Sequence, residues 1–102
     1  MADFELRYSP LFYNDFDKIT DYILLELKNQ PAAKKLVYDT EAAISKRLSN
    51  PLGPPPYKSI GGREHSYRRI IVSNYLIFYV VIDDTMIIRR MLFGQRDIDR
   101  IL

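Results

Sequence analysis

The sequence contains no cysteine and no tryptophan, and its single histidine is His65. Without cysteine the chain has no disulfide, no thiol nucleophile and no cysteine-ligated zinc site. One histidine also excludes every metal site that needs two imidazoles. A Gly-rich phosphate loop and a nucleophile elbow are both missing from the sequence. Most conventional catalytic constellations are therefore excluded.

A long apolar run is also missing. The longest stretch without a charged residue covers residues 70–82, which is 13 residues, whereas a membrane-spanning helix needs roughly 20. The N-terminal residues 1–5 are acidic and lack a basic-then-apolar pattern, so we expect no signal peptide. A chain of 102 residues can form one core, which predicts a single domain over 1–102. We expect a soluble, cytoplasmic protein with no membrane partner.

The small net charge of +2 hides a difference between the two parts of the chain. Residues 1–57 carry 7 basic and 8 acidic side chains, a net charge of −1, whereas residues 58–102 carry 8 and 5, a net charge of +3. Most arginines lie in the second part. Guanidinium groups form forked contacts with phosphate or carboxylate. The second part therefore either binds an anionic partner or is a solvated sheet face rich in arginine.

The first half of the chain predicts one strand and two helices. Residues 4–8 alternate apolar and charged side chains, which is typical of a half-buried strand. Ser9 followed by Pro10 is an N-cap signal for a helix that continues to about Lys28. A break at residues 29–31 precedes a second helix, which ends at residues 49–51. The short connection predicts an antiparallel helical hairpin.

The second half predicts a spacer and three strands. Residues 50–62 hold four of the six prolines and three of the four glycines, which favours an extended spacer over a ligand for an aromatic groove. Strands are expected at residues 67–72, 75–82 and 85–93, joined by two-residue turns.

The predicted fold is therefore α+β, with the order β-α-α-β-β-β. The N-terminal strand and the three-strand meander form an antiparallel sheet, and the helical hairpin packs against one face of it. The other face of the sheet is expected to be open to solvent or to a partner.

The residues that remain as candidates for chemistry are arginines and aromatic residues of this sheet. A catalytic triad through His65 is disfavoured, and Asp83 with Asp84 is best interpreted as a hairpin tip. Successive strand residues point to opposite faces, so Arg68 and Arg69 cannot both contact the same partner. Guanidinium groups beside aromatic rings suit phosphates and unstacked bases, and they suit an acidic protein segment equally well.

Three segments carry a family resemblance. Residues 6–10 followed by 15–23 resemble the first strand and first helix of the RelE/ParE superfamily of bacterial toxins, the toxic halves of type II toxin–antitoxin pairs. Residues 67–79 resemble the central hairpin of that superfamily, and residues 88–97 resemble its last strand and the Arg-Asp pair after the glycine. The superfamily fold is also the one that the residue pattern predicts.

The resemblance implies one of two activities. One branch of the superfamily enters the ribosomal A site and cuts the bound mRNA, and the other branch poisons DNA gyrase. Cleavage by the ribose 2′-hydroxyl needs a base, an acid and positive charge around the phosphate. We expect ribosome-dependent mRNA cleavage, with gyrase poisoning or an inactive antitoxin-binding module as alternatives.

The resemblance also implies site residues. Arg68 and Arg96 match basic positions that bind phosphate and stabilise transition-state charge, and His65 is a candidate acid or base. Leu76 stands where the nucleases usually carry arginine, and the C-terminal segment lacks their Tyr or His, which keeps the gyrase alternative open. The remaining candidates, expected to bind substrate, are Arg63, Tyr67, Arg69 and Arg90.

The partners implied by the resemblance are a cognate antitoxin and either the ribosome with mRNA or DNA gyrase. We expect an acidic, partly disordered antitoxin that shields Arg68 and Arg96. Operator DNA is expected to be bound only through the antitoxin complex. The resemblance implies neither a cofactor nor a metal.

Overall fold

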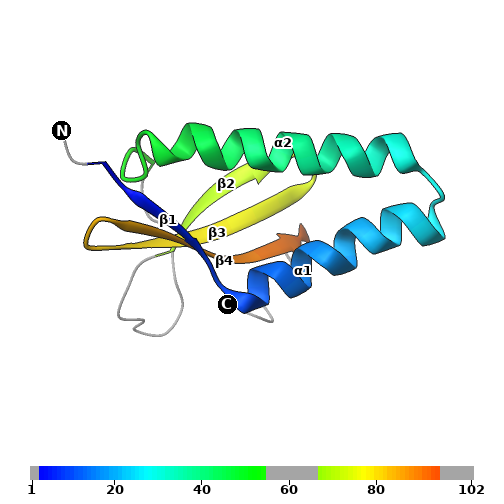
Figure 1. Cartoon of the computed structure of the whole chain (residues 1–102), viewed down its shortest axis with the longest axis horizontal. Coiled ribbons are helices and arrows are strands. Elements are labelled where there is room, and N and C mark those ends of the chain that lie inside the picture. The colour runs from blue at the N-terminus through cyan, green and yellow to red at the C-terminus, as the bar shows by residue number, and fades with distance from the viewer. Residues whose placement is uncertain (1–2, 55–66, 95–102) are drawn as a thin grey trace.

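A computed structural model describes residues 3–54 and 67–94 of the chain. Its elements occur in the predicted order of strand, two helices and three strands (Figure 1). They are β1 (Glu5–Tyr8), α1 (Pro10–Asp21), η1 (Tyr22–Glu26), α2 (Gln30–Leu48), β2 (Arg68–Val72), β3 (Tyr75–Ile82) and β4 (Thr85–Phe93). The predicted α+β class and element order are therefore confirmed.

The four strands form a mixed sheet in the order β1-β4-β3-β2. β2, β3 and β4 form the expected antiparallel meander. β1 pairs in parallel with β4, from Glu5 opposite Thr85 to Tyr8 opposite Ile88. We predicted a purely antiparallel sheet. That prediction was wrong for β1, which runs parallel to its neighbour β4.

The number of elements between β1 and β4 explains their parallel pairing. α1 and α2 run in opposite directions, so the chain returns to the end of the sheet at which β1 began (Figure 1). β2 therefore runs in the same direction as β1. β3 reverses that direction and β4 restores it, which makes β4 parallel to β1.

Ser9 begins α1 as the sequence predicts. Its side-chain oxygen accepts a hydrogen bond from the backbone N–H of Phe12 at 3.2 Å, and Pro10 occupies the first helical turn. The same hydroxyl donates to the carbonyl oxygen of Arg89 in β4 at 2.7 Å. One side chain therefore both caps the helix and attaches it to the sheet.

The first helix differs from the prediction at its C-terminal end. The α-helical pattern stops at Asp21, and η1 continues it as a single π-helical turn. The backbone N–H of Leu27 bonds to the carbonyl oxygen of Tyr22 at 3.1 Å, and Lys28 then adopts a positive φ of 50°. The wider turn and the left-handed residue complete the reversal into α2.

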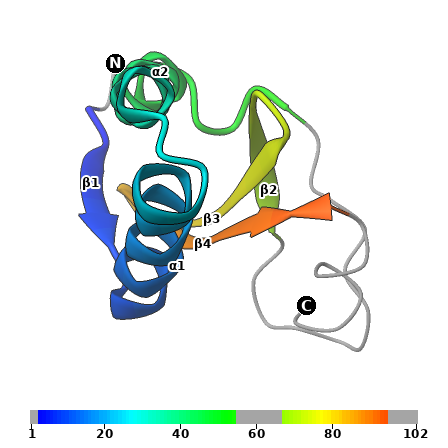
Figure 2. The ribbon, with the colours of Figure 1, turned by 90° about the vertical axis from the view of Figure 1, so that its right-hand side faces the viewer.

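Asn29 begins α2, because its side chain accepts a hydrogen bond from the backbone N–H of Ala32 at 3.1 Å. Figure 2 shows α1 and α2 on the same face of the curved sheet. α1 packs against β4 and α2 packs against β2. In the described part of the chain, no helix is long and apolar enough to cross a membrane.

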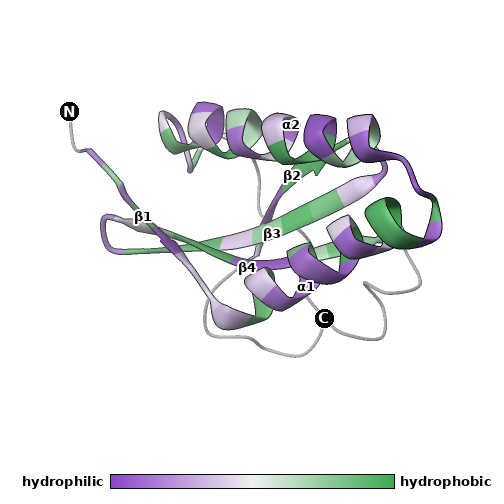
Figure 3. Ribbon diagram, turned by 45° about the vertical axis from the view of Figure 1, so that its right-hand side comes forward, coloured by the Kyte–Doolittle hydropathy of each residue, from purple (hydrophilic) through white to green (hydrophobic). Residues whose placement is uncertain are grey.

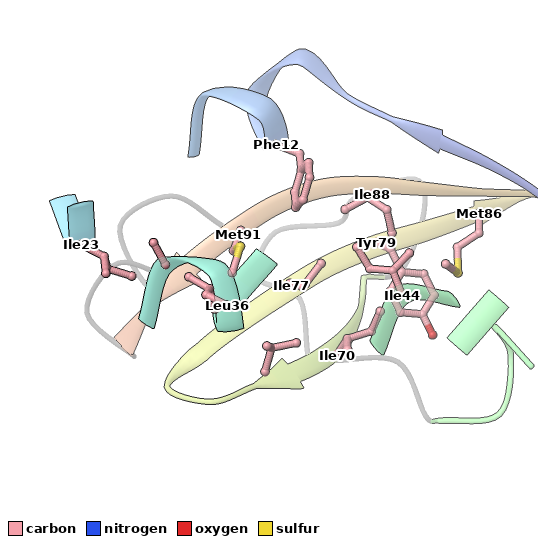
Figure 4. Packing of buried hydrophobic residues seen from close by; sticks show 12 residues of the cluster. Phe12, Ile23, Leu36, Ile44, Ile70, Ile77, Tyr79, Met86, Ile88 and Met91 are labelled. Atoms are coloured by element: carbon pink, nitrogen blue, oxygen red, sulfur yellow. The ribbon is translucent and has the colours of Figure 1, made fainter. Parts of the chain in front are cut away.

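The main hydrophobic core lies between the helical hairpin and the sheet. The apolar positions of α2 alternate with polar ones along the helix (Figure 3), and its buried apolar side chains belong to one cluster with those of β2, β3 and β4. Figure 4 shows this packing, in which each helix and each of β2, β3 and β4 takes part. Its labelled residues are Phe12, Ile23, Leu36, Ile44, Ile70, Ile77, Tyr79, Met86, Ile88 and Met91.

A second hydrophobic cluster lies on the face of the sheet opposite the helices. Its strand residues alternate with those of the main core. It contains Tyr67, Phe78, Val80 and Leu92, and Phe78 has no exposed surface. We predicted that this face of the sheet is open, and at these positions that prediction was wrong. β3 is apolar at every position from Tyr75 to Ile82, so its side chains require burial on both faces.

Candidate functional site

The predicted site residues fall into two groups. Arg63, His65 and Arg96 lie outside the described residues, so their roles stay predictions. Tyr67, Arg68, Arg69 and Arg90 lie within the described residues and are placed in turn below.

Arg68 and Arg69 open β2 and lie on opposite faces of it. Arg68 shares its face with the core residue Ile70, is partly buried, and donates from Nε to the carbonyl oxygen of Pro54 at 3.2 Å. Arg69 is exposed and shares its face with Ile71. A ligand that contacts the Arg68 side chain from the helix side therefore does not meet the side chain of Arg69.

Arg47, which was not among the predicted site residues, contacts the backbone of β2 next to Arg68. It lies in the last turn of α2. Its Nη1 donates to the carbonyl oxygen of Arg69 at 2.8 Å and to the hydroxyl oxygen of Tyr79 at 3.2 Å. Its guanidinium carbon lies 5.9 Å from the centre of the Tyr79 ring. The only sequence signal was that arginine is rare in the first half of the chain.

Tyr79 contacts Arg47 and lies in the strand next to Arg68. It is completely buried in the core (Figure 4), and its hydroxyl donates to the carbonyl oxygen of Pro51 at 2.7 Å while accepting from Arg47. It also lies directly opposite Arg68 in the β2–β3 pairing. We name this group the Arg47–Tyr79–Arg68 cluster. It lies where the end of α2 meets the start of β2.

Arg90 has a structural partner. Its Nε and Nη2 donate to the two carboxylate oxygens of Asp15 in α1 at 2.7 and 3.0 Å, and both side chains are less than one-fifth exposed. Asp15 also accepts the backbone N–H of Met91 at 3.0 Å. Because the β1–β4 pairing ends at Ile88, this carboxylate takes the place of a strand partner for the next part of β4. Two donors of Arg90 are therefore occupied by Asp15.

Tyr67 and Leu76 contribute to the second hydrophobic cluster. Tyr67 is 8% exposed, and its ring packs edge-on against Phe78 with 6.2 Å between the ring centres. Leu76 is partly buried against the same cluster. Aromatic and leucine side chains at these positions contribute packing area. The position that carries arginine in the nucleases is here part of an apolar surface.

Two tyrosines have perturbed acidity. Burial raises the pKa of the Tyr8 phenol, and the nearby Tyr13 and Glu41 raise it further. Burial also raises the pKa of Tyr75, with a smaller contribution from Tyr22. Raised values keep both phenols protonated at neutral pH, so they can donate hydrogen bonds but cannot act as bases.

An apolar groove of about 550 Å³ lies between α1 and α2. Phe16, Leu24, Ala33, Val37 and Tyr38 form most of its lining. Its chemistry suits an apolar side chain rather than a phosphate. Among residues 3–54 and 67–94, no group of three or more His, Cys, Asp or Glu side chains could hold a metal ion.

The fold of this chain is similar to that of several solved structures. The chain is similar to a chain of the chromosomal ParDE system from P. aeruginosa, with 18% identity, a TM-score of 0.71 and coverage of 91% of this chain and 98% of that one. It is also similar to a chain of the RelB–RelE antitoxin–toxin complex from Methanococcus jannaschii, with 24% identity, a TM-score of 0.53 and coverage of 94% and 99%. YafQ from E. coli gives 13% identity, a TM-score of 0.58 and coverage of 93% and 97%.

These similarities establish the fold. A family match of the sequence then identifies the class of protein. The family described as ParE toxin of type II toxin–antitoxin system, parDE, matches residues 6–98. The chain therefore belongs to the ParE toxin family and is the toxin of a type II toxin–antitoxin system. A comparison with curated proteins gave no match.

Proposed function

We propose that this toxin arrests growth by poisoning DNA gyrase. The observation that carries the proposal is the match of the ParE toxin family over residues 6–98, because the gyrase-directed branch of the resemblance is the ParE-like one. The sequence alone favoured mRNA cleavage over gyrase poisoning, and this proposal reverses that order.

The geometry of the described residues supports the same choice. Arg90 is bound to Asp15, Tyr67 is packed in an apolar cluster, and Leu76 adds to that cluster. A nuclease needs an acid and a base that converge on one phosphate. A gyrase poison needs neither, because gyrase itself breaks and rejoins the DNA.

The proposal is tested by inducing the toxin without its antitoxin. We expect growth arrest, accumulation of cleaved DNA bound covalently to gyrase, and transcripts of full length. Intact DNA together with cut transcripts on ribosomes would contradict the proposal. Absence of any growth defect, with tight antitoxin binding, would instead identify a binding module without toxicity.

Ribosome-dependent mRNA cleavage is the second candidate function. Arg68 supports it, because that side chain is partly exposed and opens a strand whose backbone Arg47 contacts at the next residue, Arg69. Arg96 and His65 complete the candidate set from the sequence. Arg68→Ala and Arg96→Ala would each abolish transcript cleavage on ribosomes if this function holds, whereas Lys18→Ala, an exposed change in α1, would leave it intact.

We propose that the cognate antitoxin covers Arg68 and Arg96 with an acidic segment. Charge reversal of both arginines to glutamate is expected to weaken antitoxin binding by at least tenfold, measured by calorimetry on the purified pair. Unchanged affinity would contradict this placement. Operator DNA is then bound through the antitoxin complex, and the toxin acts in the cytoplasm, where its target is found.

A further inference from the structure

The apolar groove between α1 and α2 is a surface that folding leaves in contact with water. The two helices cover one face of the sheet (Figure 2), and the groove between them has a volume of about 550 Å³. Phe16, Thr20 and Leu24 line it on the side of the first helix. Leu24 is 40% exposed. Apolar surface of this kind is typical of a site where another molecule binds.

The α2 side of the groove consists of two rows of side chains spaced four residues apart. One row is Gln30, Lys34 and Tyr38, and the other is Ala33, Val37 and Glu41. Rows with this spacing are the ridges by which one α-helix packs against another. The groove side of α2 therefore has the surface pattern of a helix-binding site.

Tyr38 is the most exposed aromatic side chain of the groove. Its exposed fraction is 72%, although Ala33 of the neighbouring row is buried. Aromatic rings bury a large area and are frequent anchors of protein interfaces. The Tyr38 ring gains little burial from the fold of its own chain, so most of its apolar surface is available to a second molecule.

Lys34 and Glu41 place opposite charges at the two ends of this surface. They are seven residues apart, which is two helical turns, so they lie on the same side of α2 and about 10 Å apart along its axis. Both are exposed, and within residues 3–54 and 67–94 neither forms an ion pair. Lys35 differs, because it is paired with Asp39 of the same helix at 2.7 Å.

This arrangement of charges is complementary to itself. The midpoint between Lys34 and Glu41 falls between Val37 and Tyr38. A second α2 that crosses the first in antiparallel direction, about a two-fold axis at that point, brings Lys34 of each copy to Glu41 of the other. A two-fold axis repeats every such contact. An unrelated helix would have to supply an acid and a base at the matching spacing, whereas a second copy has them already.

We propose that the groove between α1 and α2 binds a second copy of this chain through an antiparallel pair of α2 helices. Tyr38 of each copy then lies against Val37 of the other, between the two Lys34–Glu41 ion pairs. The dimer goes beyond the proposed function, because neither gyrase nor mRNA takes part in it. One pair of helices buries less than the about 1,600 Å² of a standard interface, so we expect the dimer to dissociate on dilution.

Sedimentation velocity of the full chain, purified free of antitoxin, tests the proposal over a series of protein concentrations. The wild type should change from monomer to dimer as the concentration rises. Lys34→Glu places two glutamates at each end of the interface, and Glu41→Lys places two lysines there. Each is expected to weaken association roughly tenfold or more, because like charges replace both attractive pairs. The double variant, Lys34→Glu with Glu41→Lys, exchanges the charges and should restore association.

Two further variants separate the groove from the rest of α2. Lys46→Glu is the matched control, because it reverses the charge of another exposed lysine of this helix outside the groove lining, and it should associate as the wild type does. Tyr38→Ser removes the central ring at constant charge and should weaken association. Thermal unfolding identifies any variant that fails to fold. If one charge variant does, the other charge variant and Tyr38→Ser decide the result.

Three results would overturn the proposal. The toxin could remain monomeric at every concentration. The single charge variants could associate as tightly as Lys46→Glu. The double variant could stay as weak as the single variants despite a native unfolding temperature. A monomeric toxin whose single charge variants bind the antitoxin more weakly would identify the groove as an antitoxin site instead. Because the assay contains no gyrase, its result does not depend on whether cleaved gyrase–DNA complexes accumulate in cells.

Discussion

At the scale of single residues, Asp15 supplies a hydrogen-bond acceptor to β4 beyond the point where its pairing with β1 ends. Its carboxylate accepts hydrogen bonds from two donors of Arg90 and from the backbone of Met91, beyond the last residue paired with β1. Asp15 was not among the residues to which the sequence alone assigned a role. Its spacing from Phe12 and Ile19, three and four residues, was the missed signal that it faces the sheet.

Asp15→Asn is expected to lower the free energy of unfolding by about 3 kcal/mol, the lower end for a broken buried ion pair, since neither side chain is fully enclosed. Urea unfolding measures the loss. Asp17→Asn, at an exposed position of the same helix, is the control and should change little. Equal effects of the two substitutions would show that the Asp15–Arg90 pair contributes no stability.

Tyr8 and Tyr75 predict how stability depends on alkaline pH. Their pKa values are raised in the folded protein, so the unfolded chain loses these protons first as the pH rises above about 10. The stabilisation is therefore complete below that pH and is lost above it. Tyr8→Phe with Tyr75→Phe should flatten the decline of unfolding free energy between pH 9 and 11, about a unit on either side of that value. Tyr38→Phe, at an exposed position, should leave the decline unchanged.

At the scale of secondary-structure elements, the features that the sequence predicted are local and the missed ones are not. The start of α1 was predictable because Ser9 and Pro10 act within one turn of the helix. The π-helical turn at Tyr22–Glu26 was not, because it is a single wider turn and the spacing of four between Ile19, Ile23 and Leu27 equally fits an α-helix. The direction of β1 depends on every element between it and β4, and no pattern within residues 4–8 contains that information.

Ser9→Ala tests the double role of this cap. We expect a loss of about 1 kcal/mol for the cap alone, and a further loss because the hydroxyl no longer donates to the carbonyl oxygen of Arg89 in β4. Ser49→Ala is the comparison, because the Ser49 hydroxyl contacts only the carbonyl oxygen of Lys46 within its own turn. Chemical denaturation of both variants should show the greater loss for Ser9→Ala.

At the scale of the whole molecule, the sheet is buried on both faces over its central strands. The charge difference between the two halves of the chain could be predicted from composition. Arg68 was selected through the family resemblance, and its role stays a prediction. The contact of Arg47 with Tyr79 could not be predicted, because it depends on where α2 ends above the sheet. Tyr67 was predicted to bind substrate, but its side chain lies on the same face of the sheet as the second cluster and packs there. Its binding role stays a prediction.

The second cluster is expected to be as important for stability as the main core. Phe78→Ala should lower the free energy of unfolding by about 3–5 kcal/mol, as for other buried phenylalanines. Phe93→Ala removes the same atoms from a side chain that is 56% exposed, so its loss should be much smaller. Thermal unfolding of both variants makes the comparison. A similar, small loss in both would mean that the face opposite the helices contributes little.

The parallel pairing of β1 with β4 also has a consequence for the timing of folding. Glu5–Tyr8 is synthesised long before its partner Thr85–Ile88. Two segments can pair only after both have been synthesised, so during translation β1 has no strand neighbour until β4 has left the ribosome. The sheet of this toxin is therefore completed only once its fourth strand is available.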